Sequence, residues 1–180
     1  MNTLRQRLRT ATAPLHERVD AAFSSFELDR LDGYRAFLRA HAQVLGPLEI
    51  ALERGGIESM LADWPQRSRR QDLLADLAEL GDSTPWPEPQ YTAQPPGWCW
   101  GAVYVIEGSR LGGRVLAKQV AEANPRAPLR YLSHRGSTPS WPVFIDQLDR
   151  QAANYPWDDV LGGAREVFER FVRAAEAEKG

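Results

Sequence analysis

The stretch GAVYVIEGSRLGG, residues 101–113, holds four glycines inside a segment that otherwise has the features of one helix. It contains no proline, has apolar residues at helical spacing, and continues into RVLAKQVAEA. Each interior glycine costs a helix roughly 1 kcal/mol relative to alanine. At about 100° per residue, Gly101, Gly108 and Gly112 lie within roughly 40° of one another, which leaves one bare helix face. A bare face allows either close helix packing or the approach of a flat molecule to the backbone, and the spacing alone leaves both open.

The remainder of the chain also has helical periodicity. Apolar residues at positions 4, 8, 11, 15, 19, 22 and 26 predict an amphipathic first helix. Further helices are expected over 31–53, with Pro47 kinking or breaking it, and over 69–81, with Gly81 as the stop signal. The glycine-bearing helix is expected over 98–123, followed by helices over 142–155 and 157–180. No alternating pattern predicts a strand, so we expect an all-α single domain over residues 1–180, with roughly six to eight helices.

Composition excludes several classes of function. The chain has 180 residues, 43% hydrophobic and 26% charged, with a net charge of −2, which argues against dedicated nucleic-acid binding or polybasic membrane binding. The one dense basic run, RSRR at 67–70, is interpreted as a solvated helix start. No run approaches the ~20 apolar residues of a membrane span, and the basic N-terminus lacks the apolar centre of a signal peptide. We therefore expect a cytoplasmic protein.

The histidines do not form a metal-binding sequence motif. His16, His41 and His134 have no histidine or cysteine at the spacing of a zinc helix, and none completes a Glu-x-x-His di-iron pair. His16 nevertheless shares a helix stripe with three other polar residues, Arg9, Thr12 and Asp20. A carboxylate at i+4 can fix one ring nitrogen and leave the other free for a metal. The alternative is a partly exposed polar edge of the first helix.

Together, three segments of this sequence resemble the heme oxygenases. They are LRTATAPLH at 8–16, LDGYRAFLRAHAQVLGPLE at 31–49 and YVIEGSRLGGRVLAK at 104–118. The resemblance is greatest to the bacterial branch that supplies biliverdin to bacteriophytochromes. It implies an all-α domain that holds heme between a proximal and a distal helix. It also implies degradation of heme, with O₂ and external electrons, to biliverdin, CO and Fe²⁺, the electrons coming from a ferredoxin or a reductase.

The resemblance assigns roles on the proximal side of the heme. His16 is placed as the ligand of the heme iron, and Asp20 as the carboxylate that supports the far nitrogen of that histidine. Arg9 is placed near a heme propionate, and Thr12 keeps the threonine found one turn before the ligand.

On the distal side, Gly108 and Gly112 match the glycines whose backbone lies over the heme, and Gly113 completes the pair. Gly101 is left with a packing role near the helix start. Ser109 stands where animal heme oxygenases have an aspartate that organises proton-delivering water, and a hydroxyl is a weaker acceptor than a carboxylate. Two further cofactor contacts are predicted at Tyr104 and at a C-terminal cation, for which we choose Arg150 over Arg165 and Arg170.

Three other functions stay open at this point. Ser109 is compatible with a protein that binds or senses heme without degrading it. A thiaminase-type hydrolase on a similar fold would need a catalytic cysteine, for which Cys99 is the one candidate, although a buried structural thiol fits it better. A purely structural helical module would leave His16 without a role.

Overall fold

The computed structural model describes residues 2–85, 87–134 and 140–180, and their regular structure is entirely helical. These residues form eight α-helices and one 3₁₀ helix: α1 (Leu4–Phe23), α2 (Leu31–Arg54), α3 (Ile57–Met60), α4 (Trp64–Arg67), α5 (Arg70–Glu79), α6 (Pro96–Ala123), α7 (Trp141–Gln151), η1 (Ala152–Asn154) and α8 (Trp157–Lys179). The prediction of an all-α fold is confirmed. Among the described residues, no helix is both long and apolar enough to cross a membrane.

Local sequence signals set most of the helix ends. Thr3 caps α1 through a capping box with Gln6, which satisfies two backbone donors at the helix start. Gly81 follows α5 with a φ of 80°, as predicted for a stop signal. Pro47 does not break its helix, because α2 runs through it, and the alternative of a kink at Pro47 stays a prediction. Pro47 lies in a continuously buried stretch from Val44 to Glu49, and we infer that this packing offsets the lost backbone hydrogen bond.

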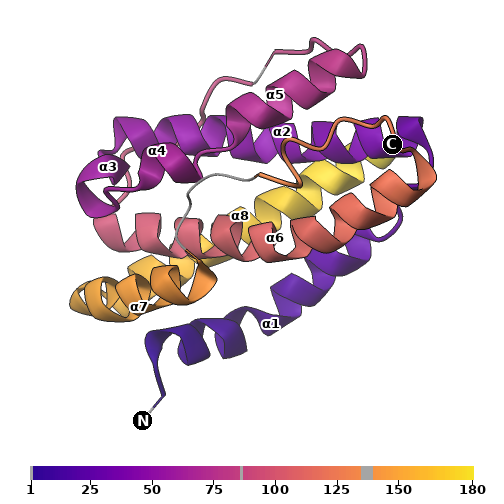
Figure 1. Ribbon diagram of the computed structural model, residues 1–180. Helices are drawn as coiled ribbons and strands as arrows, with labels where there is room; N and C mark the ends of the chain where they lie inside the picture. Colours follow the sequence, from indigo (N-terminus) through magenta and orange to yellow (C-terminus); the bar gives the residue numbers. More distant parts are fainter. Residues whose placement is uncertain (1, 86, 135–139) are drawn as a thin grey trace.

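The C-terminal helix α8 is the centre of the fold. It packs extensively against α6, α1 and α2, while α5 packs on α2 (Figure 1). In Figure 1, α6 crosses the middle of the molecule, α1 runs below it and α8 passes behind α6. Helices α1 and α6 share a common support in α8, and no comparable packing joins them directly.

Glycines allow α6 and α8 to cross at close range. A Cβ atom on Gly101 would lie 1.9 Å from the carbonyl oxygen of Val160, and one on Gly163 would lie 2.0 Å from the carbonyl oxygen of Trp98. Both distances are impossible for real atoms, so each helix approaches the other backbone where a side chain is absent. The packing interpretation of Gly101 is confirmed.

We expect Gly101→Ala to lower the free energy of unfolding by about 2–3 kcal/mol, because the helices must separate to admit the methyl group. Gly162→Ala is the matched control on α8. Its Cβ would meet no atom within 4 Å, so the change should be neutral or stabilising by up to ~1 kcal/mol. Urea unfolding followed by circular dichroism measures both. Equal stability of the two variants would show that the crossing is looser than these distances imply.

Candidate functional site

His16 projects from α1 as an exposed imidazole. Its side chain is 63% exposed, and its Nε2 lies 3.7 Å from an oxygen of Asp20, which is itself 69% exposed. That separation exceeds hydrogen-bond distance, so the two groups are neighbours without a fixed bond. The imidazole also lies against Phe168 of α8, with 5.8 Å between ring centroids. His16 therefore has an apolar neighbour behind it and nitrogen atoms available to a ligand.

The predicted polar stripe on α1 divides into an exposed and a buried part. Arg9, His16 and Asp20 are exposed, whereas Thr12 is 2% exposed. The Thr12 hydroxyl donates a hydrogen bond of 2.8 Å to the carbonyl oxygen of Leu8. Thr12 thus anchors the inner side of α1, and its predicted contact with a cofactor stays a prediction.

The two distal glycines of α6 leave open space beside the helix. A Cβ atom on Gly112 would meet nothing within 4 Å, and one on Gly108 would meet only the tip of the Trp141 ring, at 3.7 Å. Gly113 points elsewhere, because its Cβ would lie 3.1 Å from the carbonyl oxygen of Leu132. Close packing explains the lack of a side chain at Gly113, but nothing in the described protein explains it at Gly112.

Tyr104, one turn before Gly108 on α6, is within electrostatic reach of two arginines on α1. Burial raises the pKa of its phenol, and the positive charges of Arg5 and Arg9 on α1 oppose that rise. Those arginines are therefore close enough to act on the Tyr104 hydroxyl electrostatically. An anionic group placed between the helices would find both a phenol and cations near it.

The C-terminal cations form local ion pairs. Arg150 is exposed on α7 and pairs with Asp146 one turn earlier. Arg170 pairs with Glu166 on α8 and lies over the ring of Tyr91. The structure shows Arg150 paired with a residue of its own helix, and the assignment of Arg150 to a heme propionate stays a prediction.

Ser109 is held by two hydrogen bonds on the inner side of α6. Its hydroxyl donates to the carbonyl oxygen of Ile106 at 2.7 Å and accepts from the guanidinium of Arg69 at 3.1 Å. A serine oxygen has two lone pairs, so one remains for a water molecule. Arg69 was not predicted as a site residue, yet it is the side chain that fixes Ser109.

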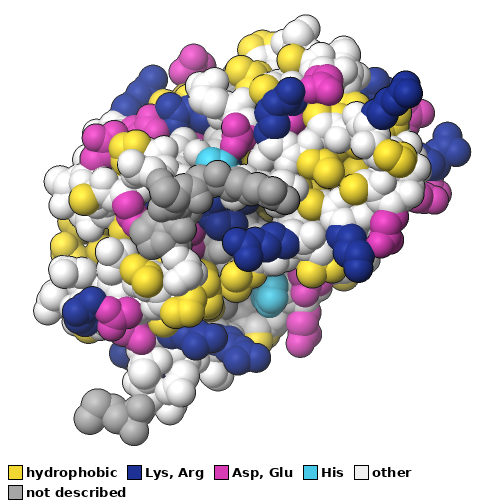
Figure 2. Space-filling view, in the orientation of Figure 1, with side chains coloured by type: hydrophobic (Ala, Val, Ile, Leu, Met, Phe, Trp, Pro, Cys, Tyr) yellow, Lys and Arg dark blue, Asp and Glu magenta, His cyan; other side chains and the backbone are white. Residues whose placement is uncertain are grey.

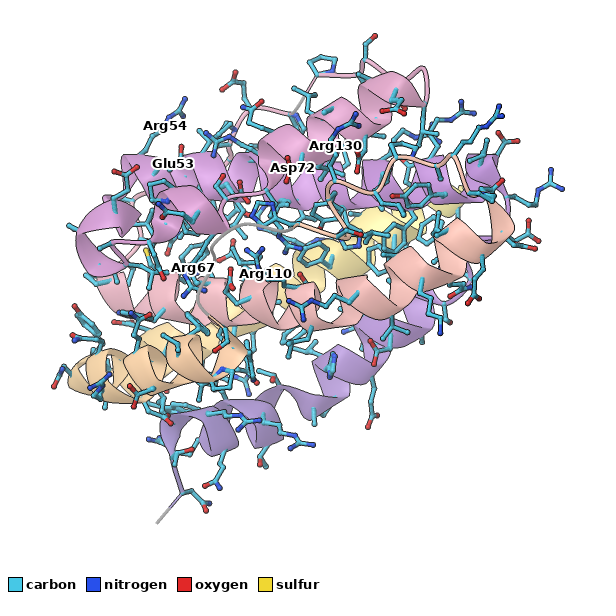
Figure 3. All side chains as sticks on the ribbon, in the orientation of Figure 1. Glu53, Arg54, Arg67, Asp72, Arg110 and Arg130 are labelled. Carbon is cyan, nitrogen blue, oxygen red and sulfur yellow. The ribbon has the colours of Figure 1, made fainter. Side chains whose placement is uncertain are left out.

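The basic run at 67–70 is buried, so its interpretation as a solvated helix start is wrong. Arg67 is 1% exposed and Arg69 is 3% exposed. Arg67 forms ion pairs with Asp63 at 2.8 Å and with Glu107 at 2.9 Å. Glu107 also pairs with Arg110 at 3.0 Å, and Figure 3 shows Arg67 and Arg110 close to each other. Buried charges require such partners, and here Glu107 of α6 compensates Arg67 from 40 residues away in the sequence.

Comparisons with known proteins place the chain in a family. It is 31% identical over 157 residues to a heme oxygenase of Xanthomonas campestris pv. campestris, covering 82% of this chain and 91% of that protein. The chain belongs to the heme oxygenase family. It is also 27% identical over 182 residues to the heme oxygenase PigA of Pseudomonas aeruginosa, covering 94% of this chain and 90% of PigA. No family model matches the sequence.

The fold agrees with that of a solved heme oxygenase. The crystal structure of the NO- and CO-bound heme oxygenase from Neisseria meningitidis superposes with a TM-score of 0.83 at 21% identity, covering 99% of this chain and 92% of that one. The heme oxygenase fold predicted from the sequence is therefore confirmed for this chain.

A half-buried histidine, His41, is expected to make the stability of this heme oxygenase fold sensitive to acid. His41 lies among Phe23, Phe37 and Phe171, and its Nδ1 is 2.6 Å from the hydroxyl of Tyr131. Burial, with a smaller contribution from Arg69, lowers the pKa of His41 from 6.5 to about 3. In the folded protein the imidazole is therefore neutral at pH 5, whereas in the unfolded chain it takes up a proton below about pH 6.5.

We expect the contribution of His41 to stability to be complete above pH 6.5 and to fall as the pH drops from 6.5 towards 3. Between pH 6.5 and pH 5 the loss is about 2 kcal/mol. The measurement is urea unfolding at pH 7 and pH 5 for the wild type and His41→Gln. The variant should show a smaller acid-induced loss than the wild type, and identical losses would contradict the assignment to His41.

Proposed function

We propose that this chain degrades heme, with O₂ and external electrons, to biliverdin, CO and Fe²⁺. Family membership supports the activity, and the geometry of α1 and α6 supports the place where it occurs. The observation that carries the proposal is the combination of an exposed imidazole at His16 with the open backbone at Gly112. Both helices rest on α8 without packing tightly on each other.

The residues present fit a heme. A porphyrin is flat and rigid, so it needs an iron ligand on one side and a surface without side chains on the other. His16 supplies an imidazole, and Phe168 behind it supplies an apolar contact. Gly108 and Gly112 supply a backbone surface that a Cβ atom would fill. Bound heme supplies the oxygen-activating iron and is also the substrate.

The chain's own residues would bind, orient and shield the substrate. We propose that His16 ligates the iron and that Asp20, 3.7 Å away, orients the imidazole once the iron holds it. Arg9 and Tyr104 are proposed to receive the propionates, because both present polar groups between α1 and α6. The glycine backbone would restrict oxidation of the macrocycle to one edge, because it leaves no room elsewhere. Gly113 and Thr12 would hold α6 and α1 in place through their packing.

Ser109 bears on the alternative of a heme-binding protein without activity. Its donor and one of its acceptor positions are already occupied by Ile106 and Arg69. This observation favours a limited role in proton delivery, in which Ser109 retains one water through its free lone pair. The thiaminase-type alternative loses support, because Cys99 is buried and burial raises the pKa of its thiol, which disfavours the reactive thiolate.

The experiment that separates enzyme from binder is addition of heme, then ascorbate, in air. An enzyme should lose its Soret absorbance and gain the broad absorbance of biliverdin, whereas a binder should keep the Soret band. Ser109→Ala is the matched variant. If the hydroxyl retains the proton-delivering water, this variant should bind heme normally and lose the Soret band roughly ten times more slowly. A wild-type Soret band that persists would contradict the proposed activity.

The cellular setting of this activity is also a proposal. We propose a cytoplasmic protein that receives electrons from a ferredoxin or a reductase. The similarity of its motifs to the biliverdin-supplying bacterial branch supports a bacteriophytochrome as recipient of the product. Pull-down of biliverdin-free bacteriophytochrome with the holoprotein, followed by chromophore assembly, tests this last step.

A further inference from the structure

Trp141 forms a wall at the Gly108 end of the open face of α6. It is the first residue of α7, and the tip of its ring would lie 3.7 Å from a Cβ atom on Gly108. That distance is an ordinary van der Waals contact, so the indole lies directly against the place where Gly108 lacks a side chain. Figure 2 shows apolar side chains gathered where the start of α7 lies against α6.

Two other aromatic rings hold Trp141 in place. Its ring centroid lies 6.0 Å from that of Tyr104 on α6 and 5.7 Å from that of Phe144 on α7, with interplanar angles of 41° and 38°. These separations are within the range of favourable aromatic pairs. Phe144 is fully buried, and the guanidinium of Arg67 lies over its ring at 5.3 Å. Because its neighbours are fixed, the indole is a rigid wall rather than a mobile surface side chain.

The other end of the same face has no such wall among the residues that the structure describes. A Cβ atom on Gly112 would meet nothing within 4 Å. Val115 points within roughly 20° of Gly108 around the helix and is 71% exposed. A flat molecule on this face can therefore extend beyond Gly112, whereas Trp141 stops it at Gly108.

A face that is closed at one end restricts how a macrocycle can rotate on it. Heme has four meso carbons around its rim, and the substituents between them differ in size and charge. The proposed contacts of the propionates with Arg9 and Tyr104 anchor one edge, but flexible propionates still allow the ring to turn. Any rotation that brings a bulky substituent onto the indole is excluded by overlap, because a packed aromatic ring yields only at a cost.

We propose that Trp141 is a specificity-determining residue of heme degradation, which admits one seating of heme on α6 and thereby selects the meso carbon at which the ring opens. The inference rests on the proposed function and adds to it the identity of a residue that sets the isomer of biliverdin. A tryptophan that served only to pack α7 on α6 would leave the seating of heme unchanged when another aromatic residue replaced it.

The test compares Trp141→Phe with the wild type by ¹H NMR of the ferric heme complex saturated with cyanide, in which each seating gives its own set of shifted heme methyl signals. The wild type should give one dominant set. Phenylalanine keeps a ring against Tyr104 and Phe144 but lacks the outer atoms that reach Gly108. The population of a second seating should therefore rise about tenfold relative to the first. Chromatography after turnover should show a second biliverdin isomer in matching proportion.

Trp157→Phe is the matched control, because it makes the same chemical change away from α6. Trp157 begins α8 and lies beneath the guanidinium of Arg7 at 4.0 Å. Arg7 points roughly 180° away from His16 around α1, so Trp157 is on the side of α1 opposite to the proposed iron ligand. This variant should keep the wild-type seating and isomer. Trp141→Leu removes the aromatic wall entirely and should increase the second seating further, and urea unfolding checks that each variant is folded.

Three results would overturn the inference alone. They are a single seating and a single isomer in both Trp141 variants, two equally populated seatings in the wild type, and the same change of seating in Trp157→Phe. Failure of the wild type to bind or degrade heme would instead contradict the proposed function, and this inference with it.

Discussion

Replacement of His16 by alanine is expected to reduce heme turnover by roughly 100-fold or more. Loss of a group that merely supports a metal ligand typically costs 10–100-fold in metal affinity or activity, so loss of the ligand itself should cost at least as much. The Soret band of the variant should lack the signature of histidine-ligated iron, and added imidazole should partly restore that signature. Heme titration with absorbance detection, followed by ascorbate-driven turnover, measures both effects.

The fold should tolerate this change, which makes the result specific. The His16 side chain is 63% exposed, and its nearest charged neighbour, Asp20, lies 3.7 Å away, beyond hydrogen-bond distance. Its removal should therefore alter the free energy of unfolding by no more than about 0.5 kcal/mol. Asp20→Asn should cost less than the loss of His16, up to about tenfold in activity. A His16→Ala protein with the spectrum and turnover of wild type would leave only the interpretation of a polar helix edge.

Leucine at Gly108 or Gly112 is expected to lower heme degradation roughly 100-fold while preserving heme affinity within about tenfold. The added side chain would occupy the space next to the bound heme, where a small misplacement is enough to cost about 100-fold in rate. At Gly112 nothing lies within 4 Å of the new Cβ, so the protein itself should fold normally. Single-turnover assays on preloaded protein separate the effect on chemistry from the effect on binding.

Gly162→Leu is the matched control, because it places the same side chain in equally open space on α8. It should turn over heme at the wild-type rate. If Gly108→Leu also degraded heme like wild type, the assignment of α6 as the helix over the reacting face would be wrong.

The fold was predictable because its signals are local. Helical periodicity predicted helices α1 and α6, and Gly81 follows α5 with a positive φ. The sequence did not show that α2 continues through Pro47, because a rule about one residue cannot include the packing of the buried stretch around it. Tertiary contacts compensate a local cost of this kind.

The candidate site could be proposed from the sequence only where one helix carries its residues. The spacing of His16 and Asp20, and of Gly108 and Gly112, follows from helical geometry alone. The contact between Arg69 and Ser109 joins residues 40 positions apart, and the ion pair between Arg67 and Glu107 does the same. No local pattern distinguishes those arginines from solvated ones, since two of their partners, Glu107 and Ser109, lie on α6. The burial of Thr12 likewise depends on how α1 packs on α8.

The most direct test of the central claim is chromatography of the products after reductant-driven turnover of heme bound to the wild-type protein. Heme bound between His16 and the glycine backbone of α6 should yield biliverdin in amounts close to one equivalent per heme, with release of CO and Fe²⁺. Recovery of intact heme, bound to a protein whose His16 and glycines are unchanged, would contradict the account.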